Sequence, residues 1–186
     1  GRGLFARLQQ VEFAGLIGFG AVTISTENPS MCSGANLGFR KSAFEAVDGY
    51  EDNLFTPSGD DEFLLYSIMH RFTHTARFLK SQDAIVNTPA HSGLSSFINQ
   101  RTRWTSKWKH NRNQKVRWNA VLFFFDYLFF YIAIIGAFLS WFSPLMIIGI
   151  VLARFIAILS FVGPVNRFMK GKHAFWPMLV FQIIYP

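Results

Sequence analysis

The chain has 186 residues, of which 51% are hydrophobic, and it carries a formal net charge of +7 together with 22 phenylalanines. This length allows one domain with a sizeable core, but the apolar content excludes an ordinary soluble domain. The single cysteine, Cys32, excludes an intrachain disulfide and any metal cluster built on several cysteines. The sequence begins at Gly1 without a signal peptide and stops inside an apolar run, so we expect a fragment of a larger protein.

Charged residues are unevenly distributed along the chain. Residues 1–118 contain 14 Lys or Arg and 10 Asp or Glu, whereas residues 119–186 contain four and one. The first part therefore has a soluble composition and the second a membrane composition. Seven basic residues and no acidic residue lie in 101–117, interleaved with tryptophan. Such a block could bind nucleic acid, but its attachment to the apolar part favours lipid headgroups, and we expect no nucleic-acid partner.

The first elements in chain order are a helix and a loop. Apolar positions at helical spacing predict a helix over 4–20 that ends in glycines and lies close to the membrane. The stretch "CSGANLGFR" predicts a tight loop that enters a short strand. Ser42 and Glu45 then have the spacing of a capping box, which predicts a helix that ends at Gly49.

Two adjacent aspartates precede the next helix. Gly59 allows a sharp turn, and Asp60 and Asp61 follow at the start of an apolar helical run that reaches residue 72. One aspartate suffices to cap the helix, where free N–H groups and the helix dipole stabilise a carboxylate. The second could serve as a general base if it faces a cleft. Spacing alone favours capping and solvation and leaves catalysis open.

Short strands and an amphipathic helix complete the first part. The runs 76–80 and 84–88 predict two strands, and 95–111 predicts an amphipathic helix opened by Ser95 or Ser96. Helices alternating with short strands predict an α/β domain.

Three side chains share one face of that amphipathic helix. Gln100, Arg103 and Trp104 are spaced i, i+3 and i+4, and they offer an amide, a fork of donors suited to phosphate and a flat indole that can stack on a sugar. The alternative is an interfacial helix whose tryptophans meet lipid headgroups. We prefer that alternative for Trp108 and Trp118, and for the three residues alone both interpretations stay open.

The second part predicts membrane helices. Residues 119–142 and 146–165 are long enough to cross a bilayer, and a third apolar run covers 174–186. Basic residues flank these spans on one side only, which predicts that residues 1–118 lie in the cytoplasm. Asp126 and Arg154 fall inside the spans, where we expect them to satisfy each other or another helix; the alternative is a path for a polar product.

Other reactive side chains carry weaker signals. His70 and His74, four residues apart on one predicted helix, have a geometry that can bind zinc, but a third ligand is missing and we predict no metal site there. Cys32 has no expected base beside it, and we predict that it is a packed loop residue. The role of His91 stays open.

Three motifs together indicate a family. The stretches "SGANLGFRKSAFEAVDGY", "GDDEFLL" and "QRTRW" occur in this order, Gln100 comes 39 positions after Asp61, and the predicted membrane helices follow. Each motif is weak alone, but together they resemble the C-terminal half of a membrane-bound family 2 glycosyltransferase, the group that includes cellulose, chitin and hyaluronan synthases. The resemblance covers about residues 10–118 and the helix arrangement.

The resemblance implies an α/β fold, namely the C-terminal half of a GT-A nucleotide-diphospho-sugar transferase domain followed by transmembrane α-helices. The expected parts are the GT-A segment over 1–94, an interfacial helix with the Q-x-x-R-W motif over 95–118, and the membrane region over 119–186. It also implies a nucleotide-sugar donor, a growing glycan or lipid-linked acceptor, contact with membrane lipids, and inversion at the anomeric carbon.

Residue roles follow from the same resemblance. The family's catalytic base maps to Asp61, and Asp60 stands where the family usually has Glu. The Q-x-x-R-W motif maps to Gln100, Arg103 and Trp104, of which the Arg contacts the donor diphosphate and the Trp helps to hold the acceptor sugar. The loop that meets the acceptor end adds three binding candidates, Gly34, Ala35 and Asn36.

The family's metal-binding D-x-D motif does not occur in this sequence. We therefore expect Mg²⁺ or Mn²⁺ in the intact enzyme, with ligands outside these residues. The resulting prediction is an inverting hexosyltransferase for polysaccharide synthesis, integral to the inner or plasma membrane. The alternatives are a single-transfer enzyme that acts on a lipid-linked acceptor, and a non-catalytic scaffold whose basic helix binds lipid.

Overall fold

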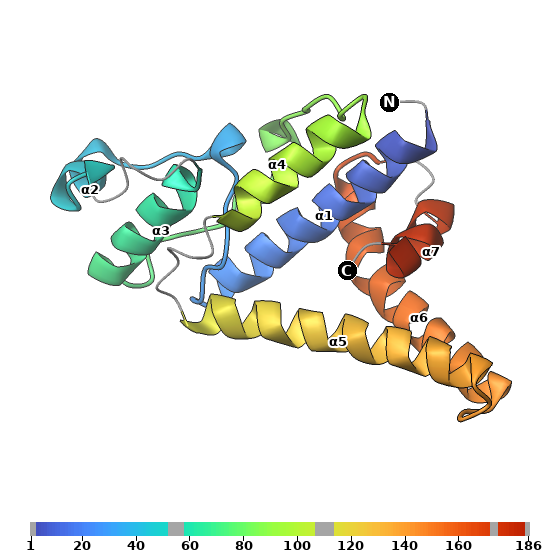
Figure 1. Cartoon of the computed structure of the whole chain (residues 1–186). Coiled ribbons are helices and arrows are strands. Elements are labelled where there is room, and N and C mark those ends of the chain that lie inside the picture. The colour runs from blue at the N-terminus through green and yellow to red at the C-terminus, as the bar shows by residue number, and fades with distance from the viewer. Residues whose placement is uncertain (1–2, 52–57, 107–113, 172–174, 185–186) are drawn as a thin grey trace. The chain divides into compact units, whose positions relative to one another are not determined.

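The computed structural model describes residues 3–51, 58–106, 114–171 and 175–184, and within these ranges the chain is helical (Figure 1). The helices are α1 Leu4–Ser25, α2 Lys41–Ala46, α3 Asp60–Arg71, α4 Leu94–Ser106, α5 Gln114–Phe138, α6 Pro144–Phe168 and α7 Phe175–Ile184. The 3-10 turns η1 Gly34–Asn36 and η3 Gln82–Ala84 lie between them.

The expected α/β fold is wrong. None of the described residues forms a strand, and no GT-A sheet is present among them. The run 76–80 is irregular, the run 84–88 is irregular after Ala84, which ends η3, and most side chains of both runs are exposed. A strand needs a neighbour to pair its backbone groups, and the described part of the chain supplies none beside these runs. The strand expected after the "CSGAN" loop is likewise irregular.

The predicted helices are present, but their ends differ from the prediction. The first helix passes the glycines and reaches Ser25. The capping box is wrong: α2 begins at Lys41, its N-cap is Arg40, and no side chain caps it. Ser42 and Glu45 therefore both lie inside the helix.

The chain divides into two compact units, which are described separately. The first contains residues 1–15 and 114–186. Its buried core joins Val11 and Ala14 of α1 to Phe155 and Val162 of α6 and to Met178 of α7. Burying the valine, phenylalanine and methionine side chains of this core stabilises the unit by about 1.5–3 kcal/mol each.

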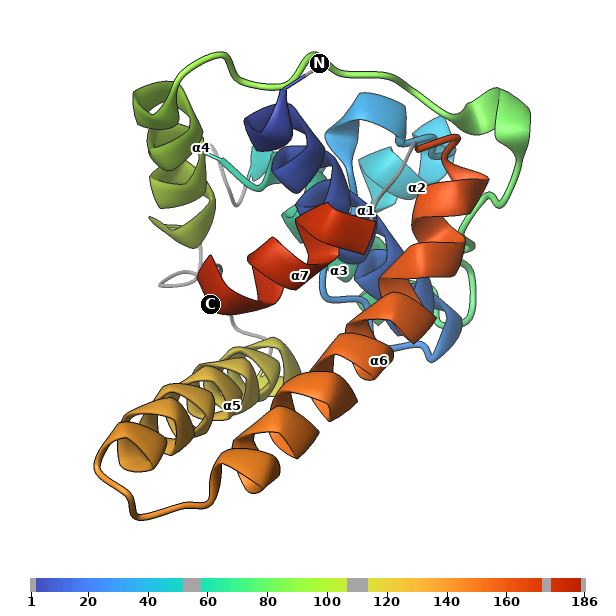
Figure 2. The same ribbon diagram turned by 90° about the vertical axis from the view of Figure 1, so that its right-hand side faces the viewer.

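Helices α5 and α6 of this unit form a hairpin joined at one end by a short loop (Figure 2). Ser143 caps α6 by accepting the Met146 N–H at 3.3 Å, and Pro144 opens the helix, where its missing N–H costs nothing. Residues Arg117–Phe138 and Pro144–Phe168 are long and apolar enough to cross a membrane, yet only 11% of each window is buried within the protein. Helices that expose so much apolar surface are unlike the core helices of a soluble domain.

Arg154 of α6 bonds to Asp126 of α5, with 2.5 Å between Nη1 and Oδ2. The same guanidinium lies over the rings of Tyr127 and Phe130, 4.8 and 4.4 Å from their centroids. The prediction that the charges of Asp126 and Arg154, within the two apolar helices, pair with each other is confirmed.

The expected third span is described only as α7, which has 10 residues. A helix that crosses a bilayer needs about 20. The predicted start of this span at residue 174 lies outside the described residues.

The second unit contains residues 16–113. Its small core joins Ile24 of α1 to Leu65 and Met69 of α3, and Cys32 and Ala76 pack against them. The prediction that Cys32 is a packed loop residue is confirmed. This core holds the end of α1, the segment before η1 and α3 together, and these elements carry the predicted catalytic aspartate.

Candidate active site

Helix α3 begins at a glycine with a left-handed backbone. The N-cap residue Gly59 has φ +103° and ψ 11°, a conformation that strains any residue with a Cβ atom. Asp60, Asp61 and Glu62 follow in the first turn. Neither aspartate is therefore the N-cap, although both lie where the helix dipole favours negative charge.

The two aspartates have different surroundings. Asp60 is exposed, whereas Asp61 is half-buried. The Oδ2 atom of Asp61 accepts the Gly34 N–H at 2.7 Å, and its Oδ1 atom accepts the Glu62 N–H at 2.9 Å. The second aspartate thus connects α3 to the η1 turn, across 27 positions of the sequence.

The segment between α1 and η1 is held in place by hydrogen bonds to α1 and to α3. The Ser30 N–H donates to Thr23 Oγ1 of α1 at 3.2 Å, and the Tyr66 hydroxyl of α3 donates to the Ser30 carbonyl at 2.6 Å. The backbone also runs close to α1, because a Cβ added at Gly20 would lie 3.2 Å from the Met31 carbonyl oxygen. This segment is held between α1 and α3, and Gly34 is brought to Asp61.

The three predicted acceptor residues form η1 and are exposed. Gly34 approaches Asp61 so closely that an added Cβ would lie 3.1 Å from the Asp61 Oδ2 atom. The Asn36 side chain donates to the Ala84 carbonyl at 2.6 Å. The structure therefore brings Gly34 to the predicted base, while Asn36 ties the turn to η3 and Ala35 lies between them.

The Q-x-x-R-W residues lie on α4, which confirms a helix over 94–106; its predicted continuation to 111 lies outside the described residues. The helix begins at Leu94, so Ser95 and Ser96 lie within it and the predicted serine cap is wrong. The Ser96 hydroxyl donates to the Gly93 carbonyl at 2.9 Å.

Arg101 is the residue on α4 that the sequence reasoning missed. Its guanidinium lies 4.3 Å from the ring centroids of both Phe97 and Trp104. Its Nη1 atom also donates to the Gln100 amide oxygen. The spacing of Phe97, Arg101 and Trp104, i, i+4 and i+7, is the sequence signal that could have found this contact.

The site residues form two groups within the second unit. Asp61 and Gly34 make one group, and Gln100, Arg103 and Trp104 make the other. Among the residues that the structure describes, no hydrogen bond or ion pair joins one group to the other. The first group offers a carboxylate beside an exposed turn, and the second offers amide and guanidinium donors with an indole.

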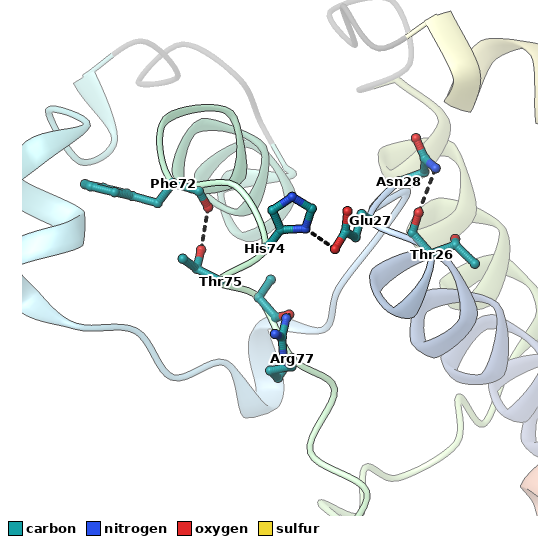
Figure 3. Close-up of polar contacts among 8 residues, drawn as sticks. Thr26, Glu27, Asn28, Phe72, His74, Thr75 and Arg77 are labelled. Carbon is teal, nitrogen blue, oxygen red and sulfur yellow. Dashed lines mark hydrogen bonds and ion pairs between the residues drawn. The ribbon is translucent and has the colours of Figure 1, made fainter.

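His74 lies beyond the end of α3, so the helical spacing assumed for zinc binding by His70 and His74 is wrong. Its Nδ1 atom instead contacts the carboxylate of Glu27, which follows the end of α1 (Figure 3). Both residues have positive φ angles, +63° and +59°. The described part of the chain brings no three His, Cys, Asp or Glu side chains together, so these residues do not fit a divalent ion.

His91, whose role the sequence left open, packs edge-on against Phe97 of α4, with 6.5 Å between ring centroids. It therefore contacts the same ring on which the Arg101 guanidinium lies.

Comparison with known proteins identifies the family. The family model described as "Glycosyl transferase family group 2" matches residues 1–163, which includes both groups of site residues, all of α5 and most of α6. No curated protein and no solved structure matches the chain significantly. The narrower likeness to cellulose, chitin and hyaluronan synthases is not part of this match. The chain belongs to glycosyl transferase family group 2.

Proposed function

We propose that the protein transfers a sugar, with inversion, from a nucleotide-sugar donor to a membrane-associated glycan, and that it serves polysaccharide synthesis. The observation that carries the proposal is the Asp61 carboxylate, half-buried at the start of α3 and bonded to the exposed turn that is proposed to meet the acceptor. A general base must lie within hydrogen-bond reach of the proton it removes, and this position beside an exposed turn supports that role.

The proposed step is a single displacement. Asp61 accepts the proton of an acceptor hydroxyl, and the hydroxyl oxygen forms a bond to the anomeric carbon of the donor sugar. The bond from that carbon to the phosphate oxygen breaks, and the nucleoside diphosphate leaves. Attack from the face opposite the leaving group inverts the anomeric configuration.

The remaining site residues are proposed to bind the two substrates. Asp60, exposed beside the base, and the η1 residues Gly34, Ala35 and Asn36 border the acceptor. On α4, Arg103 binds the diphosphate, because a guanidinium is a permanent donor fork for phosphate oxygens. Gln100 supplies an amide, and Trp104 offers a ring surface for a sugar.

The proposal includes a divalent cation, Mg²⁺ or Mn²⁺, which would neutralise the diphosphate in the intact enzyme and whose ligands lie outside these residues. It also places the protein in the inner or plasma membrane with the site on the cytoplasmic side. The exposed apolar hairpin of α5 and α6 supports the membrane placement. The basic residues that flank the hairpin in the sequence support the cytoplasmic side, because cytoplasmic flanks of membrane helices are rich in Lys and Arg.

The test is nucleotide release from a panel of UDP- and GDP-sugars by the full-length protein in membranes. We expect release with at least one donor, and its loss in the Asp61→Asn variant. Asp83→Asn removes the same charge from an exposed position in η3 and should leave release unchanged. Silence across the panel in a folded protein, or equal release by Asp61→Asn, would contradict the proposal.

A further inference from the structure

Arg101 is inserted between two aromatic rings on α4. Its guanidinium lies 4.3 Å from the centroid of Phe97, one turn earlier, and 4.3 Å from that of Trp104, one turn later. All three side chains are half-buried. A cation at this distance over a ring is attracted by the electron density of the ring face, and arginine adds the stacking of its flat guanidinium.

The contact limits how Trp104 can be used. Because Arg101 lies on one face of the indole, the opposite face is the one that remains for a flat ligand. Among the described residues, no other ring or cation lies on Trp104. A side chain held on one face also has fewer accessible rotamers, so less conformational freedom is lost when a ligand binds.

Arg101 also orients Gln100, the residue before it in the Q-x-x-R-W motif. The Arg101 Nη1 atom donates to the Gln100 amide oxygen, so the Gln100 amide is oriented with its NH₂ group available to a ligand oxygen. One side chain thus contacts two of the three α4 residues that are proposed to bind substrate, Gln100 and Trp104.

We propose that Arg101 is a positioning residue for the acceptor: it covers one face of Trp104 so that a sugar stacks on the opposite face, and it orients the Gln100 amide. This inference rests on the proposed function, because it takes Trp104 as a contact of the acceptor sugar. It adds a role for a residue that need not itself touch the substrate.

The experiment observes Trp104 directly in the full-length protein. The protein is labelled with 5-fluorotryptophan, and the ¹⁹F signal of Trp104 is identified by its disappearance in Trp104→Phe. Cellotetraose, chitotetraose and a hyaluronan tetrasaccharide serve as acceptor probes. Their Kd values are read from the shift of that signal, in wild type and in Arg101→Ala, Arg101→Lys and Arg71→Ala. Arg71, the matched control, is an exposed arginine on α3 whose guanidinium lies 5.9 Å from the Phe72 centroid.

The proposal predicts that Arg101→Ala moves the Trp104 signal of the free protein and raises the Kd of the bound tetrasaccharide about tenfold. Arg101→Lys keeps the charge but loses the flat stacking, so it should recover only part of the affinity. It also serves as the second variant if Arg101→Ala does not fold. Arg71→Ala should change neither the signal nor the Kd.

An unchanged Trp104 signal and Kd in Arg101→Ala would overturn the inference, as would a wild type in which no tetrasaccharide shifts the Trp104 signal. These results are separable from failure of the proposed function, which is read from nucleotide release. A protein that releases nucleotide in an Asp61-dependent way but shows no Arg101 effect would contradict the inference alone. Tetrasaccharide binding without nucleotide release would contradict the proposed function alone.

Discussion

Asp60 and Asp61 are adjacent and chemically identical, but the backbone assigns them different environments. Gly59 turns the chain so that Asp60 faces solvent and Asp61 faces the η1 turn. The sequence could not choose between capping and catalysis, because the Asp61 partner is the backbone of Gly34. A hydrogen bond to a backbone N–H cannot be predicted from the residue type of its donor, because almost every residue has such a group. The choice of Asp61 over Asp60 as the base came from the family resemblance, and it stays a prediction.

The close approach of Gly34 to Asp61 leads to a prediction. In Gly34→Ala, the new Cβ would lie 3.1 Å from Asp61 Oδ2, so the carboxylate must shift by a few tenths of an ångström. Misplacement of a catalytic group is costly, and we expect the rate of sugar transfer to fall about 10- to 100-fold with little change in the Tm. Steady-state nucleotide release and thermal unfolding measure the two effects.

Gly38→Ala is the matched control, because an added Cβ there meets no atom within 4 Å. It should leave transfer and Tm unchanged. Equal transfer rates for the two alanine variants would show that the Gly34 contact does not position the carboxylate.

At the scale of elements, the helices could be predicted because a 3.6-residue apolar period is a local property. Helices α1, α3 and α4 all lie where the period predicted them. Their ends were less predictable: Ser42 with Glu45 and Ser95 with Ser96 have the spacing or type of caps but lie inside helices. A cap depends on the backbone angle at one residue, which residue type favours but does not determine.

The start of α3 gives an element-scale prediction. Gly59→Ala should destabilise the fold by about 1–2 kcal/mol, because alanine is strained at φ +103°. Differential scanning calorimetry in detergent should show a lower Tm. Gly93→Ala, at the start of α4 with open space around the added Cβ, is the control, and an equal change in both variants would contradict the assigned strain.

The ion pair between α5 and α6 gives a second prediction at the scale of elements. Arg154→Leu leaves the Asp126 carboxylate without its 2.5 Å partner in an apolar setting, so it should lower the Tm in detergent micelles. The double variant Asp126→Leu with Arg154→Leu removes both charges and should be more stable than Arg154→Leu. If the double variant is the less stable protein, the two charges do not compensate each other.

For the whole molecule, the sequence predicted the division into a polar and an apolar part and the two long apolar helices, because both follow from composition. It failed on the α/β fold. The runs 76–80 and 84–88 have strand-like composition, but a strand exists only beside a partner, and no partner lies beside them among the described residues. The expectation of a sheet came from the alternation of helices with these strand-like runs and from the family resemblance, and the described residues do not form one.

Metal dependence belongs to the whole molecule, because the described residues do not gather a ligand set. If Mg²⁺ or Mn²⁺ neutralises the leaving diphosphate, EDTA should abolish nucleotide release by the full-length protein, and added Mn²⁺ or Mg²⁺ should restore it. Added Ca²⁺ should restore less nucleotide release than Mg²⁺ or Mn²⁺, because calcium is bound with longer and less regular oxygen contacts. Full activity in EDTA after extensive dialysis would contradict the metal requirement.

The most direct test of the account compares wild type with Asp61→Asn in two measurements on the same full-length protein: single-turnover sugar transfer, and nucleotide binding by calorimetry. If Asp61 is the base, the variant should transfer sugar about 10²- to 10⁴-fold more slowly while its nucleotide Kd stays within about twofold of wild type. Transfer at the wild-type rate would contradict the assignment of Asp61, and so would a loss of nucleotide binding as large as the loss of transfer.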